Sequence, residues 1–324
     1  MRPAIGHYSR IALSRHAVSA LSRALSPTGA ARQNRRMKIG AHVSTSGGLH
    51  TAFDRAAAIG AECLQIFESA PQQWGTARLT DEQVAEFRER MEASGIAPLF
   101  IHGKYLMNLA SADPKIFKTS ASTLRSSLNI AGRIGATGVI FHTGSHKGLG
   151  LAAVFDQMCD AAARVLEETP PETLMIFENS AGGGDTIGDK FDELGEVLRR
   201  LNSPRARVCI DTCHAFAAGY DLSNKKGVDA TMKELDKAIG LERVVVIHCN
   251  DSKGALGSGR DLHENIGEGN IGEAGFEALL AHPAVRDLPL VLEVPGYKIG
   301  GAGKGPDKPN VDRLKEIRAR VTAG

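Results

Sequence analysis

Seven apolar runs of this sequence have a histidine or a carboxylate residue as their last or next-to-last residue. These ends are His42, His102, His142, Glu178, Asp211, His248 and Glu293, whereas an eighth run ends at Phe67. One polar residue at one such end would show only that a strand reaches solvent. Seven ends drawn from the same few residue types are hard to explain in that way. Histidine nitrogens and carboxylate oxygens together favour Zn²⁺ or Mn²⁺.

Three more residues of these types follow the runs. His214 lies just past Asp211 in CIDTCHAF, and Asp261 and His263 form an Asp-x-His pair in RDLHE. The candidate metal ligands are then His102, His142, Glu178, Asp211, His214, His248, Asp261, His263 and Glu293. This set is too large for one tetrahedral ion but suffices for two or three ions with a bridging carboxylate. Such clusters activate water and stabilise the attacking and leaving oxygens of a phosphoryl displacement.

The runs also predict the scaffold that positions these residues. They cover residues 37–43, 62–67, 97–102, 137–142, 172–178, 207–211, 243–248 and 288–293, and helical segments separate them. In the segment 80–95, Thr80 and Gln83 have capping-box spacing and Gly95 follows as a C-terminal glycine. Eight apolar strands alternating with helices predict an α/β fold, a closed (β/α)8 TIM barrel, with functional residues at the C-terminal strand ends. An open doubly wound sheet is the alternative, but STSGGLH (44–50) lacks its GxGxxG signature.

Composition and cysteine usage narrow the class of protein. With 42% hydrophobic and 23% charged residues the chain has a soluble globular composition, and no apolar run is long enough to span a bilayer. Five scattered cysteines indicate a reducing compartment rather than a disulfide scaffold. Cys209 lies two residues before Asp211, so we expect it on the same side of the strand, one layer deeper, as a core residue.

Residues 1–36 differ from the rest of the chain. They hold seven arginines and no acidic residue, and without them 32 basic and 37 acidic residues remain, a formal charge of −5. This basic extension fits either a start codon placed ahead of Met37 or an organelle transit peptide, and we expect it to be disordered. We therefore predict a single barrel domain over 37–324. The first reading predicts a bacterial, cytoplasmic, nucleoid-associated protein, and the second predicts an organellar one.

The motifs along the chain resemble those of the endonuclease IV family, the zinc-dependent apurinic/apyrimidinic (AP) DNA-repair endonucleases of AP endonuclease family 2. From about Met37 to the C-terminus these motifs are KIGAHVSTSGGL, FIHGKYLMNLA, FHTGSH, ENSAG, CIDTCHAFAAGYD, HCNDSK, RDLHENIGEGNIG and LVLEVPG. They are long, ordered and spread along the chain, so the resemblance is specific. It implies a xylose-isomerase-like TIM barrel that binds three zinc ions, with Mn²⁺ as an alternative at one of them.

The resemblance also implies how the ligands are divided. One ion would be held by His102, His142 and Glu178, and a second by Glu178, Asp211, His248 and Glu293, with Glu178 bridging. The third would be held by His214, Asp261 and His263. Glu178 and Glu293 would be the catalytic residues that fix the metal pair and orient the nucleophile.

The activity that the resemblance implies is that of a deoxyribonuclease IV of the phage T4-induced type. A zinc-bridging hydroxide would cleave the DNA backbone 5′ to an abasic site, leaving a 3′-hydroxyl and a 5′-deoxyribose phosphate. Blocked 3′ ends would be trimmed at the same site. The partner is then double-stranded DNA with abasic sites or blocked 3′ ends, and the protein is expected to be a monomer with no membrane partner.

Four residues are expected to contact DNA on the same grounds. Tyr105 and Leu106 match a loop that enters the minor groove, and His42 either contacts DNA or caps the first strand. In FESAPQQW (67–74), Gln72 stands where the family commonly has arginine, and Glu68 and Ser69 replace more basic residues. Losing these cations should weaken DNA binding and flatten its salt dependence.

The sequence is also compatible with two other functions. A metal-dependent sugar isomerase on a similar barrel often uses a catalytic lysine, and Lys104, Lys147 and Lys253 follow strand ends. A damage-binding protein would hold zinc without cutting DNA. The segment 304–320, near the C-terminus, is expected to end in a solvated helix.

Overall fold

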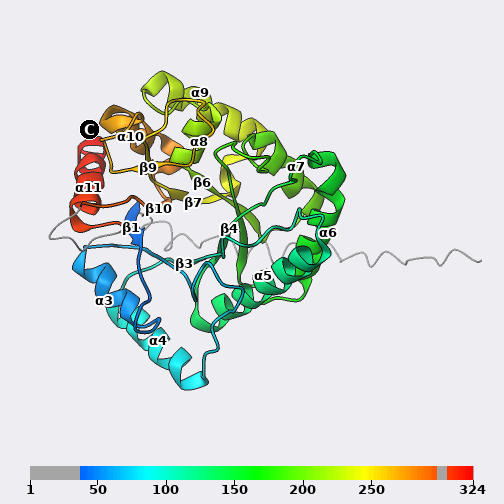
Figure 1. Cartoon of the computed structure of the whole chain (residues 1–324). Coiled ribbons are helices and arrows are strands. Elements are labelled where there is room, and N and C mark those ends of the chain that lie inside the picture. The colour runs from blue at the N-terminus through cyan, green and yellow to red at the C-terminus, as the bar shows by residue number, and fades with distance from the viewer. Residues whose placement is uncertain (1–36, 298–304, 324) are drawn as a thin grey trace, which may run out of the picture. The chain divides into compact units, whose positions relative to one another are not determined.

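The computed structural model describes residues 37–297 and 305–323, and its centre is a closed barrel of parallel strands (Figure 1). The predicted basic extension, residues 1–36, lies outside the described residues. Around the barrel the order is β1-β10-β7-β6-β5-β4-β3-β2. The strands are β1 (Lys38–His42), β2 (Leu64–Ile66), β3 (Leu99–His102), β4 (Gly138–His142), β5 (Leu174–Glu178), β6 (Ala206–Asp211), β7 (Val244–His248) and β10 (Pro289–Leu292). The predicted (β/α)8 TIM barrel is confirmed, and each predicted run holds one strand.

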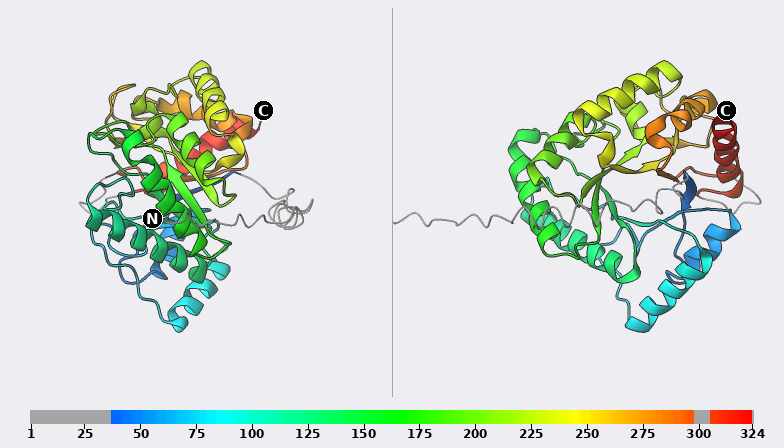
Figure 2. Two further views of the ribbon diagram at one scale, coloured as in Figure 1. Left: turned by 90° about the vertical axis from the view of Figure 1, so that its right-hand side faces the viewer. Right: turned by 180° about the vertical axis from the view of Figure 1, so that it is seen from behind.

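Helices surround the barrel in the described part of the chain, as the views in Figure 2 show. They are α3 (Thr51–Ala58), α4 (Asp81–Ser94), α5 (Pro114–Ile134), α6 (Leu151–Glu167), α7 (Phe191–Leu201), α8 (Thr212–Ala218), α9 (Lys225–Ala238), α10 (Gly272–Ala281) and α11 (Lys308–Thr322). Between β7 and α10 the chain adds a short antiparallel pair, β8 (Asp251–Ser252) and β9 (His263–Glu264). None of these helices is long and apolar enough to cross a membrane.

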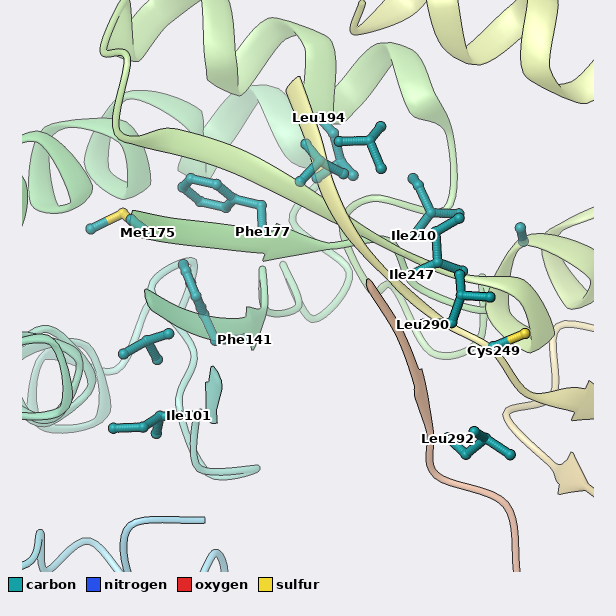
Figure 3. Packing of buried hydrophobic residues seen from close by; sticks show 14 of the residues in the cluster. Ile101, Phe141, Met175, Phe177, Leu194, Ile210, Ile247, Cys249, Leu290 and Leu292 are labelled. Atoms are coloured by element: carbon teal, nitrogen blue, oxygen red, sulfur yellow. The ribbon is translucent and has the colours of Figure 1, made fainter. Parts of the chain in front are cut away.

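Strand alternation divides the core into two apolar layers. One layer lies between strands and helices and includes Phe141, Phe177 and Leu194 (Figure 3). The other is a small plug formed by Cys63, Phe100, Ile140, Ile176, Cys209, Val246 and Val291, all of them buried. Each plug residue comes from a different strand run and has the opposite parity to its outward-facing neighbours, so the plug fills the barrel interior. Cys209 therefore lies in the core, as predicted.

The structure confirms one helix prediction and contradicts another. Helix α4 begins with the predicted capping box at Thr80 and Gln83 and ends at Gly95 with φ 64°. The prediction of a solvated helix near the C-terminus is wrong, because α11 buries Val311, Leu314 and Ile317 completely. Its apolar residues recur at helical spacing, so one face of α11 packs on the core. Arg318 is buried with that face and pairs with Glu62.

Candidate metal centre

The candidate ligands form a layer directly above the apolar plug. A residue two positions beyond each plug residue faces the same side of its strand. This relation carries the chain from the plug to the mouth in six strands: Phe100 to His102, Ile140 to His142, Ile176 to Glu178, Cys209 to Asp211, Val246 to His248 and Val291 to Glu293. The register of the barrel thus assembles six of the predicted ligands at one end.

The other three ligands come from the segments that follow β6 and β7. Asp211 caps α8, because its Oδ1 accepts a hydrogen bond from the His214 amide at 2.8 Å, and this turn directs His214 toward the mouth. Asp261 lies just before β9, and His263 is on that strand. The Asp261 carboxylate lies 3.1 Å from Nε2 of His214 and 3.2 Å from Nε2 of His263.

The structure brings all nine predicted ligands together. Candidate ligand atoms of His102, His142 and Glu178 lie within 4.8 Å of one another, and so do those of Glu178, Asp211, His248 and Glu293. These are the first two predicted groups, and they share Glu178. In the third predicted group, Asp261 contacts both His214 and His263. A ligand atom of Asp211 also lies within 4.8 Å of those of His214 and His263.

Three of the histidines are oriented by backbone carbonyl groups. Nδ1 of His102 lies 2.7 Å from the Gly103 oxygen, Nδ1 of His214 lies 2.9 Å from the Asn179 oxygen, and Nδ1 of His263 lies 3.3 Å from the Glu293 oxygen. A carbonyl can only accept a hydrogen bond, so each Nδ1 carries the proton. Nε2 of each ring is then the nitrogen left to bind a cation once it has lost its own proton, which is the arrangement typical of metal-ligating histidine.

The chemistry of these atoms fits bound cations. Among the described residues, Glu178 Oε2, His214 Nε2 and His263 Nε2 are buried and have no hydrogen-bond partner. A buried polar atom without a hydrogen-bond partner is costly, and a cation bound in place of the histidine protons would supply the missing interaction. Histidine nitrogens mixed with carboxylate oxygens suit Zn²⁺. The residues present therefore fit the metal ions that the sequence predicts.

Gln65 is a residue of the centre that the sequence analysis missed. It is fully buried on β2, its Nε2 donates to Glu293 Oε1 at 2.6 Å, and its Oε1 accepts from His248 Nε2 at 2.8 Å. The proton on His248 Nε2 leaves Nδ1 free to face Glu178 at 2.9 Å. The sequence does carry a signal for Gln65. It is a polar residue inside the apolar run 62–67, two residues after the plug residue Cys63, and so faces the same side of the strand.

His42 lies beside the same carboxylate. Its Nδ1 is 3.0 Å from Glu293 Oε1, and its ring packs 4.3 Å from the Phe67 ring. The structure therefore places His42 next to a candidate ligand rather than only at the end of a strand. Its contact with DNA stays a prediction.

Two asparagines hold Asp211 and Glu293 in place. Asn250 donates from Nδ2 to Asp211 Oδ2 at 2.7 Å, and its Oδ1 accepts from the Glu293 amide at 2.7 Å. Asn179 accepts from the Asp211 amide at 2.7 Å and donates to the Asp211 carbonyl at 3.2 Å. Such outer contacts fix the orientation of ligand side chains.

Asp251 organises the loop behind His263. Its buried carboxylate accepts hydrogen bonds from the amides of Ser252, Gly267, Gly269, Ile271 and Gly272, at 2.8–3.3 Å. In the antiparallel pair of β8 and β9, Asp251 lies opposite Glu264, and Ser252 lies opposite His263. The GEGNIG loop is therefore wrapped around one carboxylate, and that carboxylate fixes the strand that carries His263.

The carboxylates and histidines of the cluster shift one another's pKa values. Burial alone would lower the pKa of His214, but Asp211, Asp261 and Glu178 raise it to about 10. Burial likewise opposes the raised pKa of His263, which reaches about 9 beside Asp211 and Asp261. Burial would raise the pKa of Glu293, yet His248 and His42 hold it well below its usual range. The carboxylates thus favour the protonated form of His214 and His263.

Two adjoining clefts open above the ligands. One, of about 530 Å³, is lined by His102, Tyr105, His142, His214, Lys253, Asp261, Leu262, His263, Glu264, Glu293 and Pro295. The second, of about 710 Å³, is lined by His42, Gln72 and neighbouring residues, and shares Tyr105, His263 and Glu293 with the first. Tyr105 is 57% exposed and Leu106 is 37% exposed. The predicted DNA-contacting residues Tyr105 and Gln72 therefore border the ligand cluster.

The structure also shows the surroundings of Glu68 and of two lysines that follow strand ends. Glu68 is not an acidic group that faces DNA, because its side chain is 1% exposed and lies 3.7 Å from the equally buried Lys104. Lys104 does not line either cleft, so it does not provide the catalytic lysine of a sugar isomerase. Lys253 does line the first cleft.

We expect zinc binding at pH 7 to release protons, because the pKa values of His214 and His263 in the metal-free protein lie above 7 and metal ligands must be unprotonated. Affinity should rise between pH 6 and pH 9, by about tenfold per pH unit for each proton displaced. Titration calorimetry of metal-free protein in two buffers of different ionisation enthalpy counts the protons. His263→Ala should lower that count, whereas His282→Ala, far from the cluster, should not. No proton release at pH 7 would contradict the prediction.

Asp251→Asn should destabilise the protein by about 3 kcal/mol, because one amide side chain cannot accept the same set of backbone hydrogen bonds. Urea unfolding measures this change. Asp54→Asn is the matched control, since the Asp54 side chain is 76% exposed, and it should shift stability by less than about 0.5 kcal/mol. An equal change in the free energy of unfolding for both substitutions would show that the hydrogen bonds of the Asp251 carboxylate contribute little to stability.

Comparisons with known proteins identify a family and agree with the observed fold. Residues 53–319 match the family model described as "Xylose isomerase-like TIM barrel". A "Probable endonuclease 4" of Methanoculleus marisnigri is 41% identical over 86% of this chain and 98% of its own length, and one of Halothermothrix orenii is 37% identical over 86% and 99%. The crystal structure of endonuclease IV from Thermus thermophilus is 33% identical, with a TM-score of 0.75 over 89% of this chain and 100% of that one. The chain belongs to the endonuclease IV family, on the xylose isomerase-like TIM barrel fold.

Proposed function

We propose that this protein is a DNA-repair endonuclease that hydrolyses the phosphodiester bond 5′ to an abasic site, leaving a 3′-hydroxyl and a 5′-deoxyribose phosphate. The observation that carries the proposal is the nine-residue ligand cluster at the floor of the two clefts. The relatives named as endonuclease 4 support DNA as the substrate. A blocked 3′ end presents the same sugar and phosphate groups, so we extend the proposal to trimming of such ends.

Three Zn²⁺ ions are the proposed cofactors, in the groups predicted above, with Mn²⁺ as an alternative at one of them. When bound, they would lower the pKa of a water molecule and stabilise the attacking and departing oxygens of a phosphate diester. The four carboxylates of the cluster, Glu178, Asp211, Asp261 and Glu293, carry a charge of −4. Three divalent cations would exceed that charge by +2, which favours binding of an anionic phosphate.

The two catalytic carboxylates have different surroundings. Glu178 is 1% exposed and belongs to two ligand groups, so its role is to hold them at a fixed separation. Glu293 lines both clefts, and its side chain is 15% exposed. Gln65 and His42 hold Oε1 of Glu293, while Oε2 lies 3.2 Å from His248. Glu293 is therefore the ligand carboxylate placed to orient a water molecule toward the substrate phosphate.

The edge of the cleft supports recognition of an abasic site. The ring of Tyr105 packs 5.3 Å from Phe67 and 5.7 Å from His102, which fixes its orientation while its outer part stays exposed. An exposed aromatic and the adjacent Leu106 suit insertion where a base is missing. A nucleotide without a base loses little stacking when it leaves the duplex, so selectivity for damage follows.

We also infer the oligomeric state and the location of the protein from the resemblance to the family. The protein acts as a monomer on double-stranded DNA, in the bacterial cytoplasm at the nucleoid, or in an organelle if residues 1–36 are a transit peptide.

Glu178→Gln should abolish cleavage of a duplex with one abasic-site analogue, by about 10³-fold or more in kcat, because it removes charge from the carboxylate shared by two ligand groups. Cleavage 5′ to the lesion is followed on denaturing gels. Chelator-treated wild-type protein should lose activity and regain it with Zn²⁺, and Glu277→Gln on the outer helix α10 should match wild type. Lesion binding without cutting, by wild-type protein with its metals present, would instead favour a damage-binding protein.

Gln72→Arg should strengthen binding to abasic duplex and steepen the plot of log K against log salt by about 0.9, the value for one added phosphate contact. Gln73→Arg adds the same charge at a neighbouring exposed residue that does not line the cleft. Fluorescence anisotropy at several salt concentrations compares the two variants. Identical slopes would mean that position 72 does not face the DNA backbone.

A further inference from the structure

A buried ion pair joins two segments that border the clefts. The first segment, residues 67–77, follows β2 and carries Gln72, and the second, residues 103–111, follows β3 and carries Tyr105 and Leu106. Glu68 of the first segment and Lys104 of the second lie 3.7 Å apart, and each side chain is 1% exposed. We call these residues the Glu68–Lys104 pair. They are separated in sequence by α4 and β3.

Both partners make further hydrogen bonds. Oε1 of Glu68 accepts from Ser127 Oγ of α5 at 3.0 Å, and Oε2 accepts from the Ala77 amide at 3.2 Å and from Ser69 Oγ. Lys104 Nζ donates to the Ala70 carbonyl at 3.1 Å and to Ser69 Oγ. The pair therefore contacts both ends of the first segment and one helix of the scaffold.

The residues adjacent to the pair are those that face the clefts. Phe67 precedes Glu68 and Tyr105 follows Lys104, and their rings meet edge to face at 5.3 Å. Displacement of either segment would move Tyr105 and Gln72 relative to the ligand cluster. An ion pair removed from solvent holds its geometry well when its other hydrogen-bonding atoms are satisfied, as they are here.

We propose that the Glu68–Lys104 pair is a positioning element that fixes the two segments as one rigid edge for recognition of damaged DNA. The proposal rests on the proposed function, since it names how the same site holds its substrate. Neither residue contacts the DNA. The acidic residue that looked unfavourable for DNA binding instead sets the position of the residues that make the contact.

The test uses the full chain with its metals and three variants, Glu68→Gln, Lys104→Met and the double variant. KM and kcat are measured on an abasic duplex, and activity is measured on the small diester bis(p-nitrophenyl) phosphate, which is too small to span the edge. We expect KM for the duplex to rise about tenfold or more in all three variants, with kcat and small-diester activity within about twofold of wild type. The exposed pair Lys225 and Asp229 on α9 provides the matched control, Lys225→Met with Asp229→Asn.

Thermal stability separates positioning from simple destabilisation. Each single substitution leaves one buried charge without its partner, whereas the double variant leaves none. We therefore expect Tm to fall in the single variants and to recover in the double variant, while KM for the duplex stays raised. A double variant with wild-type KM, or an equal loss of activity on both substrates, would overturn the proposal.

The protein's single tryptophan gives a readout that does not depend on catalysis. Trp74 lies in the first segment and is partly buried. Acrylamide should quench its fluorescence more strongly in the three variants than in wild type or the α9 control. Unchanged quenching would overturn the proposed positioning role. Wild-type protein that fails to cut abasic DNA would instead refute the proposed function, and the quenching result would still decide whether the pair fixes the edge.

Discussion

The buried carboxylate of Glu178 is the group on which the centre depends. It lies inside the barrel with His248 at 2.9 Å, His102 at 3.4 Å and His142 at 3.5 Å. A charge in such a place is tolerated only when other groups compensate it. The histidines around Glu178, the carbonyl groups that orient them and the asparagines behind Asp211 all serve this requirement. The apolar plug beneath excludes water from below, so the centre is open only toward the clefts.

Much of this arrangement could be predicted from the sequence because it follows from two regular patterns along the chain. Apolar runs alternating with helical segments predicted the barrel, and polar residues at the ends of those runs marked the candidate ligands. Both patterns are local in sequence. The pairing of the strands in a closed barrel then brings the candidate ligands of different strands close together. The ligands His214 and Asp261 lie outside the barrel strands, as does His263, and the spacing of their motifs marked them as candidates.

The features that were missed or misread depend on contacts between distant segments. Gln65 resembled one polar interruption of an apolar run, and only its position opposite Glu293 and His248 gives it a role. The sequence marked Glu68 only as an acidic residue in place of a more basic one, because its partner Lys104 lies beyond the next helix and strand. Helix α11 looked solvated because charge dominates its composition, although its apolar residues form one continuous face. Composition and local spacing do not report which surface a side chain meets.

The pairing of β1 with β10 has a consequence for biosynthesis. These strands come from the two ends of the barrel sequence, and His42 on the first reaches Glu293 just beyond the last. A nascent chain still short of residue 293 lacks both the strand that closes the sheet and one carboxylate of the second ligand group. The complete set of candidate ligands in that group therefore exists only after the last barrel strand has been made. A truncated chain would expose the open edges of β1 and β7, which makes it a target for chaperones and proteases rather than a partly active nuclease.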